Sequence, residues 1–340
     1  MKTKWTNLLD LGLCGLGWSD VASAYDRLPA RADGVVPDHV MDLGRQSAGM
    51  WVDFRSDAPS LHARCMLRQP PVSEHHYIKY LDLYCRDGEG RWRWAGVSRY
   101  GFIPSGETPL TEGLPAAMRE WRLYLPLTYK VERLEIGIPS DSRIDKVEAD
   151  TRKPVVIYGT SIVHGCGHVS RPGMAWPSIA ARRLDYPLIN LGFSGSACME
   201  PELGAIIAEL DPAAWVIDPL ANMSLELVEK NARPFLRHLV QARPQTPLLF
   251  IEDRTHANAW LNPGYLPAQQ KKQAAFRAVA DELQAEGFSV SYLAGADLIG
   301  TDGEATTDGS HPSDLGAMRY AETVLPILRK ILIDTGSLHS

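Results

Sequence analysis

The pattern of apolar and polar residues changes once along the chain, near residue 150. Up to about residue 140, apolar and polar residues alternate in short runs, which is typical of β-strands that bury one face. The segment 120–127 is a clear example, with an apolar residue at every second position from Trp121 onward. The segments 80–85 and 91–97 flank a glycine-rich connection, which predicts a β-hairpin. No convincing helical period interrupts these strands, so residues 1–150 are predicted to form a β-sandwich or jelly roll.

A polar, charged segment at 139–153 suits a domain junction, and beyond it apolar runs alternate with helical patterns. The runs are 154–158, 187–191, 214–218, 247–251 and 288–293. Apolar residues at i, i+3, i+4 and i+7 predict helices around 203–210 and 276–283. A last helix is expected over 312–333, where Pro326 would kink or split it. Residues 151–340 are therefore predicted to form an α/β domain with a doubly wound, five-stranded parallel sheet.

Composition narrows the class of protein. A chain of 340 residues is long enough for two domains. Its net charge of -6 argues against a nucleic-acid partner, which favours a basic patch. No apolar run approaches the roughly 20 residues that a membrane-spanning helix needs, so no membrane partner is expected. The oligomeric state stays open, a homo-oligomer included.

The N-terminus resembles a secretory signal peptide, because two lysines precede an apolar stretch at 8–18 and small residues at 22–24. However, Asp10 and several glycines interrupt that stretch, so we predict that it forms the first strands of the fold. The five cysteines are scattered and include no CxxC pair, which favours reduced thiols and a cytoplasmic location.

Candidate chemistry gathers in loops that follow the predicted parallel strands. Ser161 follows the first strand, and Asp308 and His311 lie in the loop after the last one. A nucleophilic serine needs a base, a group that orients the base, and donors for the oxyanion. Gly195 and Asn222, which follow the second and third strands, would supply a backbone and a side-chain donor. Because the carboxyl ends of parallel strands share one edge, we expect these residues to converge.

These blocks resemble the ordered motifs of the SGNH (GDSL-type) hydrolase superfamily. The resemblance rests on Gly159-Thr160-Ser161, on Asn190 to Gly195, on Asn222 and on Asp308-x-x-His311. It implies Ser161 as nucleophile, His311 as base, Asp308 as its partner, and no cofactor. It also implies an oxyanion hole made by Gly195, Asn222 and the N–H of Ser161. The chain departs from the common pattern at Thr160, where many members have Asp, and around Asn222, which lacks the usual Gly-x-Asn-Asp form.

More narrowly, the segments 80–84, 159–164, 170–175 and 308–316 resemble a bacterial subgroup that places a β-sandwich before the hydrolase domain. Its members include carbohydrate esterases. This resemblance implies a serine esterase that hydrolyses short-chain esters, with O-deacetylation of a carbohydrate as the expected reaction.

Two other functions remain open. One is a carbohydrate-binding protein with a vestigial hydrolase site, and the other is a metal-dependent hydrolase that uses His164 and His168. We expect no metal, and we expect His164 to line the mouth of the site or to pack behind Ser161. In the long segment 252–267, Trp260 and Tyr265 either form a stacking wall for substrate or only pin the loop to the surface.

Overall fold

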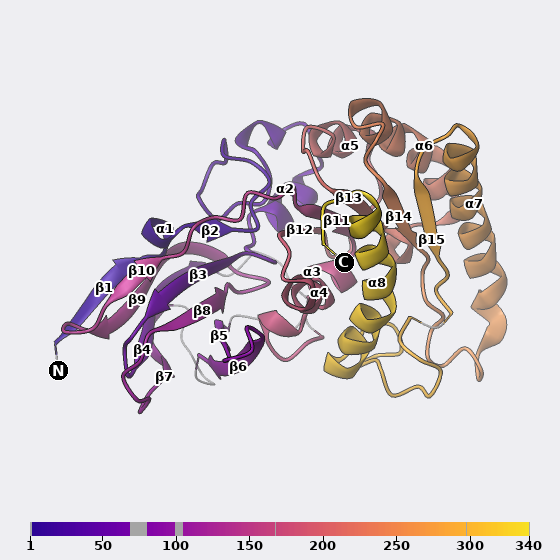
Figure 1. The fold of residues 1–340 in the computed structure, drawn as a ribbon. Coiled ribbons are helices and arrows are strands. Elements are labelled where there is room, and N and C mark those ends of the chain that lie inside the picture. The colour runs from indigo at the N-terminus through magenta and orange to yellow at the C-terminus, as the bar shows by residue number, and fades with distance from the viewer. Residues whose placement is uncertain (1, 69–79, 99–104, 167, 297, 340) are drawn as a thin grey trace.

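The computed structural model describes residues 2–68, 80–98, 105–166, 168–296 and 298–339. It has two lobes, with the N-terminus at the far end of the first (Figure 1). Within the described ranges, no helix has the length and apolar character that a membrane crossing requires.

The first lobe consists of two antiparallel sheets. One runs in the order β1 (Thr3–Asn7), β9 (Lys130–Pro139), β4 (Leu61–Arg68) and β7 (Ser105–Thr111). The other runs β10 (Ile144–Lys146), β3 (Trp51–Ser56), β8 (Arg119–Tyr124), β5 (Asp82–Arg86) and β6 (Trp92–Val97), with β2 (Leu13–Cys14) beside β3. Alternate residues of β4 are buried, as the sequence pattern requires of a strand with one face in a core. The predicted β-sandwich and its β5–β6 hairpin are confirmed.

The second lobe contains a parallel sheet built from the five predicted runs. Its order is β12 (Leu188–Gly192), β11 (Val155–Gly159), β13 (Ala214–Asp218), β14 (Leu248–Ile251) and β15 (Val290–Leu293). The chain runs from β11 out to β12 and then crosses back to β13 on the other side of β11. The chain thus leaves β11 toward one edge of the sheet and leaves its neighbour β13 toward the other, and the two connections open a crevice at the carboxyl edge, where such sheets bind ligands.

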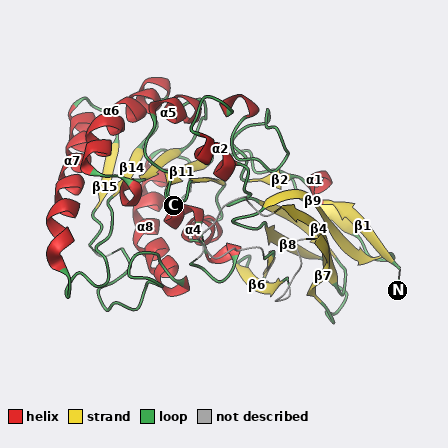
Figure 2. Ribbon diagram, turned by 180° about the vertical axis from the view of Figure 1, so that it is seen from behind, coloured by secondary structure: helices red, strands yellow, loops and turns green. Residues whose placement is uncertain are grey.

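Helices cover both faces of this sheet (Figure 2). One face carries α5 (Pro201–Ile207), α6 (Leu225–Ala242) and α7 (Leu266–Ala285), and the other carries α3 (Ser161–His164), α4 (Trp176–Leu184) and α8 (Asp314–Asp334). Val156 and Tyr158 of β11 face the first core, while Val155 and Ile157 face the second. The doubly wound α/β fold is therefore confirmed. Helix α8 continues through Pro326 to its end, so the predicted split does not occur.

Short helical turns complete the chain. They are α1 (Leu8–Leu11), η1 (Ala30–Ala32), α2 (Asp38–Gly44), η2 (Pro172–Met174), η3 (Leu220–Asn222) and η4 (Pro263–Tyr265).

The segment 18–43, which precedes most of the sandwich, packs against the parallel sheet. Leu28, Val40 and Met41 belong to the same apolar core as Trp215 of β13. In Figure 1 this segment, with α2, reaches across to the second lobe. A division at residue 150 stays our prediction for the two domains, and this segment crosses it.

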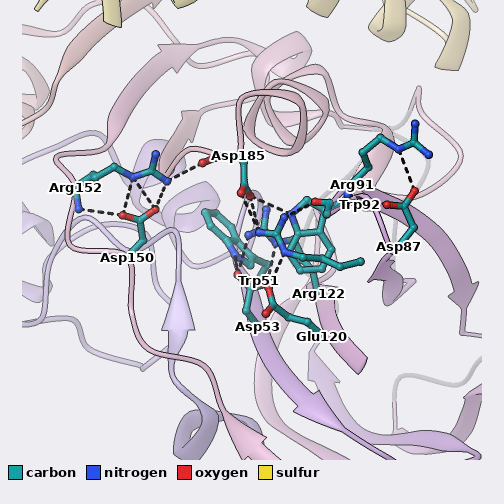
Figure 3. A network of polar contacts seen from close by, with 12 residues as sticks. Trp51, Asp53, Asp87, Arg91, Trp92, Glu120, Arg122, Asp150, Arg152 and Asp185 are labelled. Atoms are coloured by element: carbon teal, nitrogen blue, oxygen red, sulfur yellow. Dashed lines mark hydrogen bonds and ion pairs between the residues drawn. The ribbon is translucent and has the colours of Figure 1, made fainter. Parts of the chain in front are cut away.

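A polar network joins the sandwich to the end of α4 (Figure 3). Arg122 of β8 forms a two-point ion pair with Asp53, at 2.8 and 2.7 Å, and its guanidinium stacks on Trp51 and Trp92. Next to it, Arg86 bonds Asp185 at 2.8 Å, just beyond α4. Planar guanidinium groups match both carboxylates and aromatic faces, so arginines suit such a junction.

Candidate active site

Ser161 lies at the sharp turn from β11 into α3. Thr160 caps the turn, because its hydroxyl accepts the N–H of Ile162 at 3.3 Å. A Cβ at Gly159 would lie 2.4 Å from a Val163 methyl and 2.7 Å from the Asp218 carbonyl oxygen, so only glycine fits before the turn. The turn therefore holds the serine at the crevice beside the centre of the sheet.

A chain of hydrogen bonds runs from Ser161 through His311 to Asp308. The Nε2 atom of His311 is 2.9 Å from the Ser161 Oγ, and its Nδ1 is 2.7 Å from Asp308 Oδ2. The other carboxylate oxygen accepts the backbone N–H groups of Ser310 and His311, at 2.9 and 2.7 Å. Desolvation opposes ionisation, but these hydrogen bonds outweigh it and hold the pKa of Asp308 well below its usual range. An ionised Asp308 fixes the proton on Nδ1, so that Nε2 is able to accept the serine proton.

The ring of His168 stacks on the ring of His311. Its ring lies 3.8 Å from the His311 ring, at an angle of 6°, and its Nδ1 is 2.8 Å from Thr307 Oγ1. Among the described residues, His168, Asp308 and His311 place possible metal-ligand atoms within 4.8 Å of one another. However, the lone pairs of parallel rings do not converge on one ion at the roughly 2 Å that a zinc–nitrogen bond requires. The stacked His168 ring is therefore better placed to hold the His311 ring in position than to bind a metal with it.

The structure does not form the His164–His168 pair considered for a metal. The His164 side chain is fully buried behind Ser161, and its Nε2 lies 2.8 Å from the Leu127 carbonyl oxygen of the first lobe. It therefore does not line the mouth of the site, and no substrate contact follows from its position.

The two expected oxyanion donors lie in loops that a hydrogen bond connects. Gly195 has a φ of 68°, is exposed, and faces open space, since an added Cβ would meet no atom within 4 Å. Asn222 ends η3, and its Oδ1 accepts the backbone N–H of Ala197 at 3.4 Å. With its oxygen held in this way, the amide NH₂ of Asn222 remains as the donor for an oxyanion.

The segment 252–267 packs beside the loop that carries the histidine. The Ala257 N–H donates to the Gly309 carbonyl at 2.8 Å. The Tyr265 hydroxyl bonds Asn258 at 3.3 Å, and its ring meets His256 edge to face. Trp260 is 82% exposed at the tip of the segment. Tyr265 thus pins the segment, whereas Trp260 presents an aromatic face to solvent.

A buried carboxylate of the first lobe holds the chain that follows α3, a role that our sequence analysis did not predict. Asp82 of β5 has no exposed surface and accepts Arg171 at 2.7 Å and the Gly173 N–H at 2.8 Å, in the chain after α3. Burial raises the pKa of this carboxyl, and Arg171 opposes that effect. The detectable signal was an acid between Leu81 and Leu83 in an otherwise apolar strand.

Arg27 is fully buried between the lobes. Its guanidinium donates to the carbonyls of Asn190 and Gly192, at 3.1 and 2.8 Å, and to those of Gln46 and Leu43. Burial lowers its pKa to about 9. The carbonyls of Asn190 and Gly192 lead directly into the loop of Gly195, so a residue of the N-terminal segment 18–43 holds the base of that loop.

A doubly wound sheet that presents hydrogen-bonded Ser, His and Asp side chains at its carboxyl edge defines the class of α/β serine hydrolases. The chain belongs more particularly to the GDSL-like Lipase/Acylhydrolase family, whose model matches residues 152–329. Residues 3–144 match the model described as the N-terminus of Esterase_SGNH_hydro-type. The predicted superfamily is thus confirmed, and the protein is a carboxylic ester hydrolase.

Solved structures agree over nearly the whole length of the chain. A protein described as a GDSL-like lipase from Bacteroides ovatus is 29% identical, with a TM-score of 0.91 and 98% of each chain covered. The salicylyl-acyltransferase SsfX3 of a tetracycline biosynthetic pathway is 19% identical, with a TM-score of 0.78 over 98% of each chain. A family two carbohydrate esterase from Clostridium thermocellum shares the fold at 11% identity, with a TM-score of 0.60 over 86% of this chain and 94% of that one. No curated protein matches the chain.

Proposed function

We propose that the protein is a serine esterase that removes an acetyl group from a carbohydrate through an acyl-enzyme on Ser161. The observation that carries this proposal is the hydrogen-bonded chain from Ser161 through His311 to Asp308. Such a chain activates a serine that is otherwise a weak nucleophile.

The proposed reaction has two halves. His311 takes the proton of Ser161 as its oxygen attacks the ester carbonyl, and the N–H groups of Ser161 and Gly195 with the Asn222 amide stabilise the oxyanion. The carbon–oxygen bond to the alcohol then breaks, and His311 gives its proton to the leaving alcohol. Water attacks the acyl-enzyme with His311 again as base, which releases acetate and restores Ser161.

The small cavity at Ser161 supports a short acyl group. Its volume is about 10 Å³, and Ile162, Val169, Trp176 and Pro312 contribute to its walls. A volume of this size holds about one water-sized group, such as the methyl of an acetyl ester. Trp176 and Val169 are themselves buried, so a longer chain would displace packed side chains.

A larger cavity supports a bulky alcohol. It measures about 760 Å³, begins at Met223, next to Asn222, and includes His256 and Tyr265. Trp260 lines part of a further cavity of about 180 Å³. Aromatic side chains at the margin of an open cavity suit a sugar ring, so we assign the sugar to this side with Tyr265 and Trp260 as contacts. The family two carbohydrate esterases with the same fold, one of them in complex with cellohexaose, make a sugar the first class to test.

The test compares acyl groups on one leaving group and then alcohols on one acyl group. Wild type should hydrolyse p-nitrophenyl acetate much faster than the butyrate or octanoate, and Ser161→Ala should abolish the activity with or without chelator. Acetylated sugars should then exceed simple acetate esters in kcat/KM. An inactive wild type would favour a sugar-binding protein with a vestigial site, and chelator-sensitive activity that survives Ser161→Ala would contradict the serine mechanism.

A further inference from the structure

Three buried or half-buried charged side chains, Arg254, Asp253 and Lys272, form a continuous chain of ion pairs beneath the site. One end contacts the acid–base loop (residues 305–311), and the other contacts the amide loop (residues 219–223), which carries Asn222. We propose that this ionic chain is a positioning device that fixes the acid–base loop and the amide loop relative to each other. The inference rests on the proposed function of those two loops.

Arg254 holds the acid–base loop from below. Its Nε donates to the Ser310 carbonyl at 2.7 Å, and its Nη2 donates to the Ser310 hydroxyl. The Arg254 side chain is almost wholly buried, and its planar fork fixes both the place and the orientation of Ser310. Ser310 precedes His311 directly, and its own N–H bonds Asp308. A displacement of Arg254 therefore moves the base and its partner together.

Lys272 holds the amide loop. Its Nζ donates to the Leu220 carbonyl at 2.9 Å, at the start of the turn that ends with Asn222. The same ammonium lies 2.9 Å from Asp253 Oδ2. The turn η3 spans only three residues, so a fixed Leu220 carbonyl also fixes the position of the Asn222 backbone.

Asp253 joins the two cations. One carboxylate oxygen accepts Arg254 Nη1 at 2.6 Å and the other accepts Lys272. Asp253 is buried, so solvent ions screen these contacts little. Helix α7 also holds the backbone on either side, because Gln269 donates to the Arg254 carbonyl at 2.6 Å and Gln273 donates to the Asp253 carbonyl at 2.8 Å. Thus α7, which carries no residue of the Ser–His–Asp chain, sets the spacing of the two loops.

The first experiment changes each end of the ionic chain alone. Arg254→Lys keeps a positive charge but loses the fork, and Lys272→Met keeps the length but loses the charge. We expect each variant to lower kcat on p-nitrophenyl acetate by about 10- to 100-fold with little change in KM, since a shift near 1 Å has this effect on an aligned site. Labelling of Ser161 by a p-nitrophenyl phosphonate should slow in parallel.

A double variant tests whether the two ends act as one device. If they do, Arg254→Lys with Lys272→Met should lose hardly more kcat than the worse single variant, because the first change already frees both loops. Fold losses that multiply would show two independent supports and would overturn the coupling.

A matched control separates positioning from general stability. Arg319 also pairs with an aspartate, Asp302, and donates to a loop carbonyl, that of Ile299, but it contacts neither loop. Arg319→Lys makes the same substitution at a more exposed ion pair, so it should lower the melting temperature less than Arg254→Lys does, and it should leave kcat near wild type. If Arg254→Lys and Lys272→Met behave like this control, the chain is only structural and the inference fails. If wild-type Ser161 does not react with the phosphonate at all, the proposed function fails first and the inference falls with it.

A one-dimensional proton spectrum gives a readout that does not depend on turnover. The low-field resonance of the His311–Asp308 hydrogen bond should shift or broaden in Arg254→Lys and, because a change at either end frees both loops, also in Lys272→Met; a resonance that stays unchanged in Lys272→Met would overturn the coupling. An unchanged resonance in Arg254→Lys would overturn the assignment of Arg254 to the acid–base loop.

Discussion

The two sides of Ser161 are supported by different parts of the chain. On the acid–base side, the His311 ring contacts Asp308 and His168, and Arg254 holds the loop from below, so all the supports come from the second lobe. On the oxyanion side, Arg27 of the N-terminal segment 18–43 holds the strand end that leads to Gly195. The comparison shows that the second lobe carries the reacting side chains, whereas the N-terminal segment 18–43 supports one of the loops predicted to stabilise the developing charge.

The largest expected effect lies on the acid–base side. His311→Ala removes the base, and kcat should fall by about 10⁶-fold, since members of a catalytic triad act as one unit. Steady-state hydrolysis of p-nitrophenyl acetate measures this loss. Asp308→Asn should cost somewhat less, and a variant of His311 that keeps more than a few per cent of wild-type kcat would exclude it as the base.

Substitutions on the oxyanion side should lower kcat less than the loss of His311 does. Asn222→Ala removes one donor, and kcat should fall by about 10²- to 10³-fold with KM nearly unchanged. A rise in KM at constant kcat would instead assign Asn222 to ground-state binding. Asn222→Asp keeps the shape but replaces the donor with an acceptor, and it should be at least as inactive.

Arg27→Met tests the contribution of the N-terminal segment 18–43. The carbonyls of Asn190 and Gly192 lose their donor, so we expect kcat to fall about tenfold and the free energy of unfolding to fall by about 1–3 kcal/mol. Enzyme kinetics and urea denaturation give the two values. Arg45→Met is the control, since Arg45 lies just beyond the segment 18–43 and pairs with Asp42 at the surface. Unchanged kcat in Arg27→Met would mean that Arg27 only stabilises the fold.

Substitutions of His168, which stacks on His311, should lower kcat by a smaller factor. His168→Ala removes the stacked ring and should lower kcat by about 3- to 10-fold, and His168→Phe should restore most of it because the aromatic face returns. If His168→Phe is as impaired as His168→Ala, the imidazole nitrogen bonded to Thr307 matters more than the stack.

The smallest effect concerns Asp218, at the end of β13, where the amide loop begins. Burial raises the pKa of this carboxyl to about 8, and the Tyr320 hydroxyl, which donates to it at 2.8 Å, opposes the shift. The unfolded chain releases this proton near pH 4 and the folded chain near pH 8. The contribution of Asp218 to stability is therefore greatest below pH 4 and declines as the pH rises toward 8. Asp218→Asn should flatten that part of the curve of unfolding free energy against pH, and an unchanged slope would contradict the raised pKa.

Local patterns in the sequence predicted most of the fold of the second lobe. The five β-branched or apolar runs predicted the parallel strands, and the turn residues after them predicted which side chains would meet, because parallel strands share one carboxyl edge. Spacing was less useful for His168, since its stack on His311 joins loops that lie far apart in the chain.

Long-range contacts account for what the sequence did not predict. Arg27 and Arg254 are single arginines in irregular segments, and nothing near them in the chain reveals the carbonyls that they bind. The segment 18–43 shows no periodic pattern, although it fills part of the core of the second lobe. Asp82 alone left a trace, as a charge in an apolar strand.

The position of the segment 18–43 has a consequence for biosynthesis. Other residues of the same apolar core, on β13 and α6, lie roughly 200 residues later in the chain. At about 5–20 residues per second, the ribosome delivers them some 10–40 s after Met41 has emerged. During that interval the sandwich is able to fold, while Leu28, Val40 and Met41 remain exposed because the rest of their core has not been synthesised. The nascent chain therefore carries an exposed apolar stretch until the second lobe is complete.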